Sequence, residues 1–296
     1  MAEITAALVK ELRERTGSGM MECKRALQET GGDIEAAVEL MRKAGQAKAD
    51  KKASRVAAEG LIVLRQTAGA VAMAEINCET DFVTKNDDFR AFAAGVADTV
   101  LREGPADLDA LLAATMANGQ SVEQNRRDCI ARIGENINVR RGVRLTTSAG
   151  VLGSYLHGTR IGVLVELDGG DAELAKDIAM HIAASRPLCV SADQVPAELI
   201  AKEKEIYAAR ALAEGKPAHM IEKIAEGRLR KYFEEVTLLG QPFVKDPERS
   251  VEELLKSRQA RVVRFQRFGL GEGIEKKSSD FAAEVAAARG DNDSDN

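Results

Sequence analysis

Cysteine pairs are missing from this sequence. Its four cysteines, Cys23, Cys78, Cys129 and Cys189, lie far apart, and no two of them form a C-x-x-C pair. Neither a zinc knuckle nor a redox-active dithiol is therefore encoded, and we expect reduced thiols that are mostly buried. Cys78 has no base beside it that the sequence can identify, so we do not assign it as a nucleophile.

Long hydrophobic runs are also missing. No uncharged apolar segment approaches the roughly 18 residues of a membrane span, and charges occur throughout the opening "MAEITAALVKELRERTG". We expect no membrane segment and a cytoplasmic location. The composition, with 45% apolar residues, 30% charged residues and a net charge of −5, is that of a globular protein, and 296 residues allow two or more domains.

The common catalytic motifs are absent. There is no G-x-x-x-x-G-K-[ST] loop, no H-E-x-x-H and no G-x-S-x-G, and "GLGEGI" departs from the dinucleotide pattern at Ile274. Histidine is scarce: His181 falls in a helical pattern and is expected to be packed, and His219 has no motif around it. His157 follows a strand pattern beside a glycine turn, where it either contacts a partner or has no role. We expect no cofactor, no metal and no enzymatic reaction.

Two functions lead from the residues alone, and an enzyme with unrecognised chemistry is a third alternative. Only 4% of the residues are aromatic and the chain is mildly acidic, which favours an interaction protein over a nucleic-acid binder. The alternative is an RNA- or ribosome-binding protein that uses the basic linker "AKADKKASRVAAEG" and the basic strand "NVRRGVR".

The amino-terminal region predicts three short helices. Apolar residues at helical spacing start at Ile4, "TGSG" ends the first helix, two glycines end the second, and Asp33 can cap the third, "DIEAAVELMRKAG". We read the lysine- and alanine-rich stretch that follows as a solvated linker or a frayed helix. Met20 and Met21 are adjacent, so either both lie in the core or one faces outward as an adaptable contact.

The middle of the chain repeats one order of elements. "GLIVLRQTAGAVAMAEINC" predicts a β-hairpin and "NDDFRAFAAGVADTVL" a helix; "GVLGSYLHGTRIGVLVEL" and the helical run after it repeat this order. A long helical pattern from Pro196 is interrupted at "GKP", which predicts an antiparallel helical hairpin. The strand "RVVRFQRFGLGEG" and a terminal amphipathic helix with Phe281 complete the chain.

The predicted fold is α+β with antiparallel sheets. Its expected divisions are a helical docking bundle (1–55), a first core lobe (56–149), a second core lobe (150–188 and 239–272), an inserted helical hairpin (189–238) and a carboxy-terminal module whose acidic tail we expect to be disordered (273–296).

The stretch "NCETDFVTKNDDF" holds a phenylalanine in a connection, where phenylalanine is unusual. The second copy of the repeat joins its strand to its helix through the compact "DGGDAE", so the first copy spends about six residues more than the fold needs. Phe82 therefore either fills its own core or enters another protein.

Several motifs in register resemble bacterial elongation factor Ts over nearly the whole chain. They are "ITAALVKELRERTGSGMMECKRAL", "CETDFVTKNDDF", "IGENINVRR", "GSYLHGTRIGVLVEL", "MHIAAS", "LLGQPFVKD" and "GEGIEK". The resemblance implies a guanine nucleotide exchange factor that binds elongation factor Tu, and an amino-terminal bundle similar to a ubiquitin-associated domain.

The resemblance also implies which residues bind that partner. Thr80, Asp81, Phe82 and Val83 would disturb the partner's magnesium site, with Asp81 and Phe82 as the wedge. The other expected contacts are Arg13, Met20 and Met21 on the GTPase domain, His157 on the phosphate-binding side, and the terminal helix around Phe281. The helical hairpin is a candidate for contact with the partner, for dimerisation or for both, and its irregular heptads do not decide.

Overall fold

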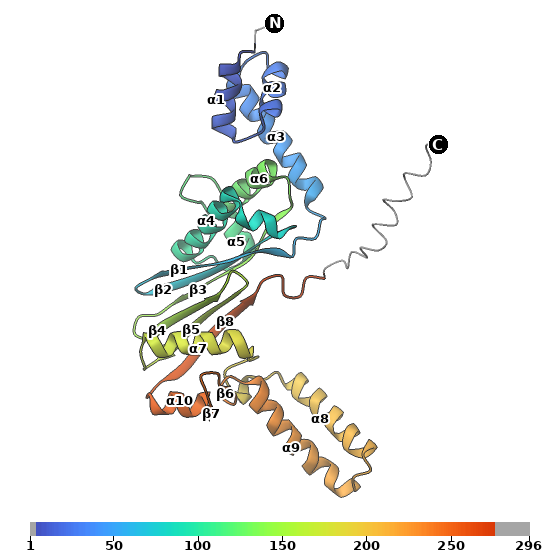
Figure 1. Cartoon of the computed structure of the whole chain (residues 1–296). Coiled ribbons are helices and arrows are strands. Elements are labelled where there is room, and N and C mark those ends of the chain that lie inside the picture. The colour runs from blue at the N-terminus through green and yellow to red at the C-terminus, as the bar shows by residue number, and fades with distance from the viewer. Residues whose placement is uncertain (1–3, 276–296) are drawn as a thin grey trace, which may run out of the picture.

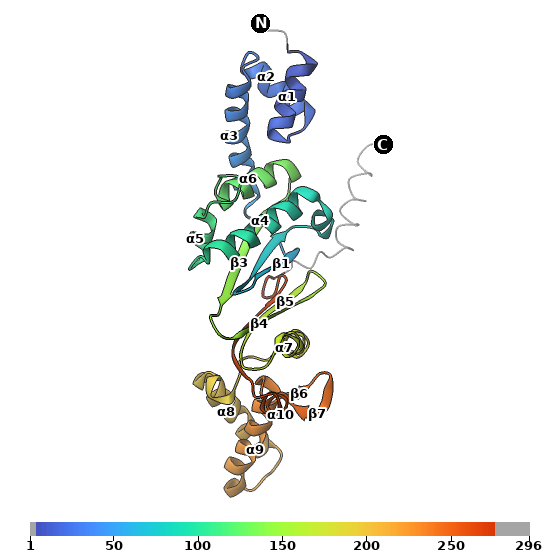
Figure 2. The same cartoon turned by 90° about the vertical axis from the view of Figure 1, so that its left-hand side faces the viewer.

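The chain adopts an α+β fold, seen here in a computed structural model that describes residues 4–275, apart from the side chains of 46–48. A helical bundle lies at one end, two sheets with their covering helices lie in the middle, and a pair of helices lies at the other end (Figure 1, Figure 2). The predicted carboxy-terminal helix with Phe281 lies outside the described residues. In the described part of the chain, no helix has the length and apolarity needed to cross a membrane.

The amino-terminal bundle consists of α1 (Ala6–Thr16), α2 (Met20–Glu29) and α3 (Ile34–Lys52). The side chain of Thr5 accepts a hydrogen bond from the Leu8 amide, and that of Asp33 accepts one from Ala36, so both helices start at capped positions. Gly17 adopts a left-handed conformation and ends α1. The bundle has its own small core around Leu12, Cys23 and Leu27.

The third helix is longer than the pattern up to Gly45 predicts: of the two alternatives for the stretch that starts at residue 47, a solvated linker or a frayed helix, the structure shows a helix as far as Lys52. α3 continues to Lys52, and Ala49 is buried in the core of the neighbouring lobe. The Lys52 ammonium donates a hydrogen bond to the Gly134 carbonyl oxygen at the end of α6. These tertiary contacts stabilise a segment that has no apolar stripe of its own, and they join the bundle to the core through a continuous helix.

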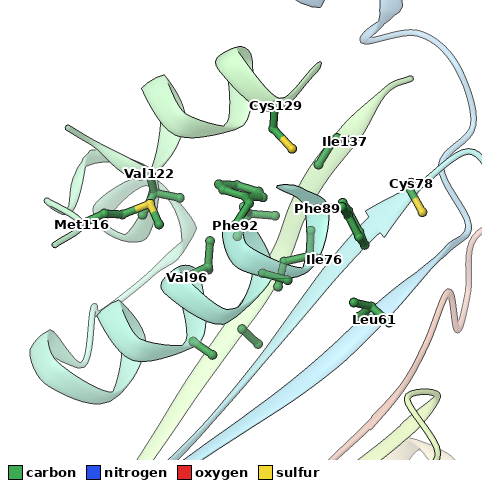
Figure 3. Packing of buried hydrophobic residues seen from close by; sticks show 14 of the residues in the cluster. Leu61, Ile76, Cys78, Phe89, Phe92, Val96, Met116, Val122, Cys129 and Ile137 are labelled. Carbon is green, nitrogen blue, oxygen red and sulfur yellow. The ribbon is translucent and has the colours of Figure 1, made fainter. Parts of the chain in front are cut away.

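The first sheet is antiparallel, with strand order β1-β2-β3, and carries its helices on one face. Its elements are β1 (Glu59–Thr67), β2 (Ala70–Cys78), β3 (Ile137–Thr146), α4 (Asp87–Glu103), α5 (Leu108–Ala113) and α6 (Val122–Ile133). Phe89, Phe92 and Val96 of α4 pack toward β2 and β3 (Figure 3). We call this sheet and its helices lobe one.

The second sheet repeats this arrangement, as the sequence predicts. Its order is β4-β5-β8, from β4 (Val151–His157), β5 (Ile161–Asp168) and β8 (Arg261–Gly269), and α7 (Ala172–Ser185) packs on it. The central strand carries a register shift in both sheets, after Glu75 in β2 and after Glu166 in β5. A small unit of β6 (Pro242–Phe243), β7 (Asp246–Ser250) and α10 (Val251–Ser257) adjoins this sheet. We call the second sheet, α7 and this small unit lobe two.

The two sheets pack against each other through their other faces. One buried cluster draws Ile62 and Met73 from lobe one and Leu164 and Phe268 from lobe two. Gly162 of β5 permits this close approach, because a Cβ there would lie 2.7 Å from the Ile62 Cγ2. The two lobes therefore share one apolar interface.

A helical hairpin lies between the parts of lobe two in sequence and extends away from it (Figure 1). It follows the short 3-10 helix η2 (Ala192–Gln194) and consists of α8 (Ala197–Ala213) and α9 (Ala218–Val236). Gly215, with φ of 71°, and Pro217 form the turn between the helices, as the sequence predicts. Its exposed large apolar side chains are Leu199, Ile206, Leu212 and Met220.

Candidate functional site

The connection between β2 and α4, residues 79–86, is the strongest candidate site, and we call it the Phe82 loop. It contains the 3-10 helix η1 (Asp81–Lys85) and spans eight residues. The corresponding connection in lobe two, from β5 to α7, needs only residues 169–171. The structure thus contains the extra segment that the comparison of the two sequence copies predicts.

Phe82 points into solvent although its neighbours are fixed. Its exposed fraction is 77%, the largest among the large apolar side chains of the described residues, and Thr80 and Asp81 are exposed beside it. Val83 differs from the other three, because its side chain is 7% exposed and packs in the core of lobe one. Val83 therefore anchors the loop from inside and does not present a surface to a partner in this conformation.

Hydrogen bonds fix the loop on the side of α4. The Asn86 side chain caps α4 by accepting from the Phe89 amide at 3.2 Å, and the Asn86 amide donates to the Val83 carbonyl oxygen. The Thr84 hydroxyl donates to the Asp81 carbonyl oxygen at 2.6 Å. The loop is consequently ordered up to the residue that carries the exposed ring.

Glu135 fixes the loop on the side of β2, and sequence reasoning missed it. Its carboxylate accepts hydrogen bonds from the backbone amides of Glu79 and Thr80 and from the Thr80 hydroxyl. The signal was present, since Glu135 lies in the motif "IGENINVRR". However, nothing in the sequence indicates that the chain just before β3 lies beside the Phe82 loop.

Cys78, at the end of β2, is a structural thiol. Burial, followed by the charges of Glu135 and Glu59, raises its pKa to about 12, so the thiol stays protonated and donates to the Thr80 carbonyl oxygen at 3.1 Å. A protonated thiol is a poor nucleophile. The other cysteines are free as well, and only Cys189 is not fully buried.

The bundle presents the expected Arg13, Met20 and Met21 on its surface. Met20 is 47% exposed, Met21 is 76% exposed, and Arg13 is exposed on α1. Both methionines lie in the first turn of α2, so the alternative that both are core residues is wrong. Exposed, flexible methionine side chains are typical of adaptable protein contacts.

His157 lies at the end of β4, exposed, with the Tyr155 hydroxyl 3.4 Å from its Nδ1. The turn after it contacts the start of β1: the Ile62 amide donates to the Thr159 carbonyl oxygen, and Arg160 pairs with Glu59 at 3.0 Å. Glu59 is the register partner of Cys78, where the Phe82 loop begins. The turn that carries His157 and the Phe82 loop are therefore at the same end of the two-sheet core.

The other histidines do not join this site. His181 is fully buried in α7, as its helical pattern predicts, with its Nε2 3.0 Å from the Gln241 side-chain oxygen. His219 is exposed in the first turn of α9, next to the turn that joins the two helices of the hairpin. Among the described residues, no group of three histidine, cysteine or acidic side chains could hold a metal ion.

Two cations of the basic stretch, Lys52 at the end of α3 and Arg55 after it, contact the protein itself. The Lys52 ammonium donates to the Gly134 carbonyl oxygen, and Arg55 pairs with Glu79 at 3.4 Å. The side-chain nitrogen Nδ2 of Asn136 donates to the Arg55 carbonyl oxygen. Side chains bound in this way offer fewer free cations to phosphates than an open linker would.

Comparison with known proteins identifies the family. The family model described as Elongation factor TS matches residues 79–272, more than half of the chain. The chain is 63% identical over 286 residues to elongation factor Ts of Methylococcus capsulatus, covering 96% of this chain and 98% of that protein. It is 61% identical over 287 residues to elongation factor Ts of Thioalkalivibrio sulfidiphilus, with 96% and 98% covered. It is also 58% identical over 290 residues to elongation factor Ts of Alkalilimnicola ehrlichii, with 97% and 99% covered. This chain belongs to the elongation factor Ts family.

Proposed function

We propose that this protein is a guanine nucleotide exchange factor for elongation factor Tu and acts in the cytoplasm. It binds the GDP-bound GTPase, releases GDP and allows GTP to load during translation elongation. No covalent step is needed, so it is an exchange factor that acts by protein binding and not an enzyme. It requires no cofactor and binds neither nucleic acid nor a membrane. The observation that carries the proposal is Phe82, a 77% exposed aromatic ring on an ordered connection.

Phe82 and Asp81 form the wedge in this proposal, and Thr80 belongs to the same contact. A magnesium ion bridges the phosphates of a bound nucleotide and the ligands of a GTPase, so displacing the element that holds those ligands weakens nucleotide binding. Burying the Phe82 ring in the partner supplies about 1.5–3 kcal/mol. A thousandfold faster release requires about 4 kcal/mol, so other contacts must contribute.

Those contacts are assigned to three further parts of the chain. Arg13, Met20 and Met21 bind the GTPase domain from the bundle, His157 acts on the phosphate-binding side, and the module that carries Phe281 adds a further grip. The position of the His157 turn at the same end of the core as the Phe82 loop supports a shared binding face. Because coupling is reciprocal, a factor that weakens GDP binding is itself weakened by GDP, and GTP completes the cycle by displacing it.

The proposed division of labour follows five modules. They are a docking bundle of the ubiquitin-associated type (1–55), lobe one of the core (56–149), lobe two (150–188 and 239–272), the helical hairpin (189–238) and the carboxy-terminal module (273–296). Separate buried clusters in the bundle and in each lobe support this division. The exposed apolar side chains of the hairpin support an additional contact there, with the partner or with a second copy.

Release of labelled GDP from purified elongation factor Tu, with magnesium present, tests the wedge. We expect wild type to accelerate release and Phe82→Ala to be roughly ten- to hundredfold slower at saturation, which corresponds to the loss of the ring's burial. Val244→Ala is the matched control, because Val244 is also an exposed apolar side chain, 44% exposed, but lies in lobe two. It should leave the release rate unchanged.

Two outcomes would contradict the proposal. If wild type leaves GDP release unchanged, the exchange function is wrong, and RNA binding through the basic segment becomes the next hypothesis. If Phe82→Ala accelerates release as wild type does, exchange stands but the wedge assignment fails.

A further inference from the structure

Glu135 binds the start of the Phe82 loop with three hydrogen bonds. Its Oε2 accepts from the Glu79 amide at 3.1 Å and from the Thr80 amide at 3.0 Å. Its Oε1 accepts from the Thr80 hydroxyl at 2.6 Å. Hydrogen bonds to an ionised carboxylate are stronger than neutral ones, so one side chain fixes both the backbone and the side chain of Thr80.

The anchor is reciprocal. Glu79 directs its own carboxylate back to the same segment, where its Oε1 accepts from the Asn136 amide at 2.6 Å. Two consecutive residues before β3 and two consecutive residues after β2 thus hold each other. Neither strand can shift its end without breaking several of these bonds.

Phe82 lies between this anchor and the anchor on the α4 side. Two residues before it, Thr80 is held by Glu135, and one residue after it, Val83 is buried in lobe one. The backbone that carries the exposed ring therefore has no free segment on either side. A ring held in this way loses little conformational freedom when it enters a partner, which favours binding.

The other half of the repeat joins the corresponding two places in a different way. In lobe two, the short connection packs directly on the residues before β8: a Cβ on Gly169 would meet the Gln259 carbonyl oxygen, and one on Gly170 would lie 3.1 Å from the Ala260 Cβ. A carboxylate also contributes there, but it belongs to the connection itself: Asp171 pairs with Arg258 at 2.5 Å. Lobe one has a longer connection at the same place in the fold, and Glu135 occupies the position from which a side chain can hold it.

We propose that Glu135 is a positioning residue for nucleotide exchange, which holds Phe82 in the geometry that enters the partner. Glu135 does not itself act on the partner in this proposal. It lowers the cost of presenting the ring by keeping the Phe82 loop in one conformation before binding. This inference rests on the proposed exchange function and on the wedge role of Phe82.

The test is GDP release from elongation factor Tu as a function of factor concentration, for Glu135→Ala and Thr80→Val. We expect the maximal release rate to fall roughly tenfold for Glu135→Ala, which removes all three bonds, and less for Thr80→Val, which removes only the hydroxyl bond. The half-saturating concentration should change less than the maximal rate, because Arg13, Met20 and Met21 are untouched. Glu135→Gln keeps one carbonyl acceptor and should fall between wild type and Glu135→Ala.

A double variant separates positioning from a general effect on the fold. If Glu135 acts through Phe82, then adding Glu135→Ala to Phe82→Ala should slow release by no more than about twofold. Glu123→Ala is the matched control, since it also removes a lobe-one glutamate that accepts three hydrogen bonds, here from Arg126 and Arg127, but Glu123 does not contact the loop. It should leave the maximal rate unchanged.

The outcomes distinguish this inference from the proposed function. If wild type accelerates release and Phe82→Ala slows it, but Glu135→Ala and Thr80→Val match wild type, the positioning role is wrong while the wedge stands. Additive losses in the double variant would also overturn it. If Glu135→Ala does not fold, Thr80→Val alone decides, because it retains the shape of the side chain. A wild-type protein without exchange activity refutes the proposed function itself.

Discussion

At the scale of single residues, adjacent positions in the Phe82 loop have opposite roles. Phe82 is 77% exposed and Val83 is 7% exposed, although both are apolar. The sequence predicts that this connection is special because it is longer than its copy and contains an aromatic ring. It cannot predict which of two neighbouring apolar residues turns inward, because that depends on the η1 backbone and on the anchors at Glu135 and Asn86.

His181 gives a residue-scale prediction on pH. Burial lowers its pKa, and the hydrogen bond with Gln241 offsets only part of that shift. The Val244 amide donates to Nδ1 at 3.2 Å, so Nδ1 must stay unprotonated, and Nε2 carries the hydrogen toward the Gln241 oxygen. The folded state therefore favours the neutral ring.

The sign of the effect follows from this preference. Below about pH 6.5 the unfolded chain binds a proton at His181 more readily than the folded chain does. The free energy of unfolding should therefore fall as pH decreases from about 6.5 through the lower pKa of the folded state. Urea unfolding at pH 7.5 and pH 5.5 measures this drop.

His181→Gln should reduce the drop, because an amide can both accept from the Val244 amide and donate to Gln241 but does not titrate. The control is a substitution of the exposed His157, which leaves His181 in place. In that variant the free energy of unfolding should show the full drop between pH 7.5 and pH 5.5. Equal drops in wild type and His181→Gln would mean that other groups cause the pH dependence.

At the scale of elements, the sequence predicts best where local chemistry decides. Gly17 and Gly215 have positive φ next to helix ends, and each lies where the sequence marks a helix end. The hairpins were predictable because alternating apolar residues surround short turns. The full length of α3 was not, because its last turns are stabilised by Ala49 and Lys52 contacting lobe one, which no local pattern reveals. α5 and the burial of Leu111 were missed for the same reason.

Two glycines give opposite predictions for the elements that contain them. A Cβ on Gly153 of β4 would lie 2.6 Å from the Ala175 backbone of α7, so Gly153→Ala should push α7 off the sheet and cost about 1–3 kcal/mol of stability.

Gly227 is exposed in α9 with nothing within 4 Å of a Cβ placed there, so Gly227→Ala should stabilise the hairpin by about 0.5–1 kcal/mol. Chemical denaturation monitored by circular dichroism measures both changes. A stabilising Gly153→Ala would show that α7 does not pack so closely on β4.

At the scale of the whole molecule, the two sheets bring distant parts of the chain to one end of the core. The His157 turn contacts the start of β1, the Phe82 loop follows β2, and the Leu270 amide donates to the Arg160 carbonyl oxygen of that same turn. The end of β8 and the turn after it, residues 269–272, thus lie beside the His157 turn. These segments lie far apart in the sequence, at 79–86, 157–160 and 269–272, so only the packing of one sheet on the other could reveal their meeting.

Glu75 joins this turn to lobe one from the inside. The side chain is fully buried in β2, where its carboxylate accepts from Arg140 at 3.0 Å, Arg141 at 2.7 Å and the Gly271 amide at 2.8 Å. Burial alone would raise its pKa, but the Gly271 amide and the two arginines together lower it below the ordinary value. Both arginines also donate to the turn, Arg141 to the Gly269 carbonyl oxygen and Arg140 to that of Glu272.

Removing Glu75 should therefore affect the joint between the lobes. Glu75→Ala leaves two arginines near the interior without their carboxylate, and we expect a loss of about 3–5 kcal/mol in the free energy of unfolding. Because the pKa of Glu75 is lowered in the folded state, its contribution is present above about pH 4.5 and is lost as pH falls through the folded value. Urea unfolding near neutral pH measures the loss, and hydrogen exchange of the amides of residues 269–272 reports whether the turn has been released.

The internal repeat supplies the matched control for this prediction. Glu166 precedes the same register shift in β5 and pairs with Arg264 at 2.7 Å, but that arginine is 52% exposed. Solvent screens such a pair, so Glu166→Ala should cost only about 0–1 kcal/mol and should leave exchange in residues 269–272 unchanged. If both substitutions cost the same and neither frees the turn, Glu75 contributes no more than its counterpart, and the placement of the turn must come from the apolar interface between the sheets alone. If only Glu75→Ala frees the turn, a buried ionic cluster fixes where the chain leaves the core toward its carboxy-terminal module.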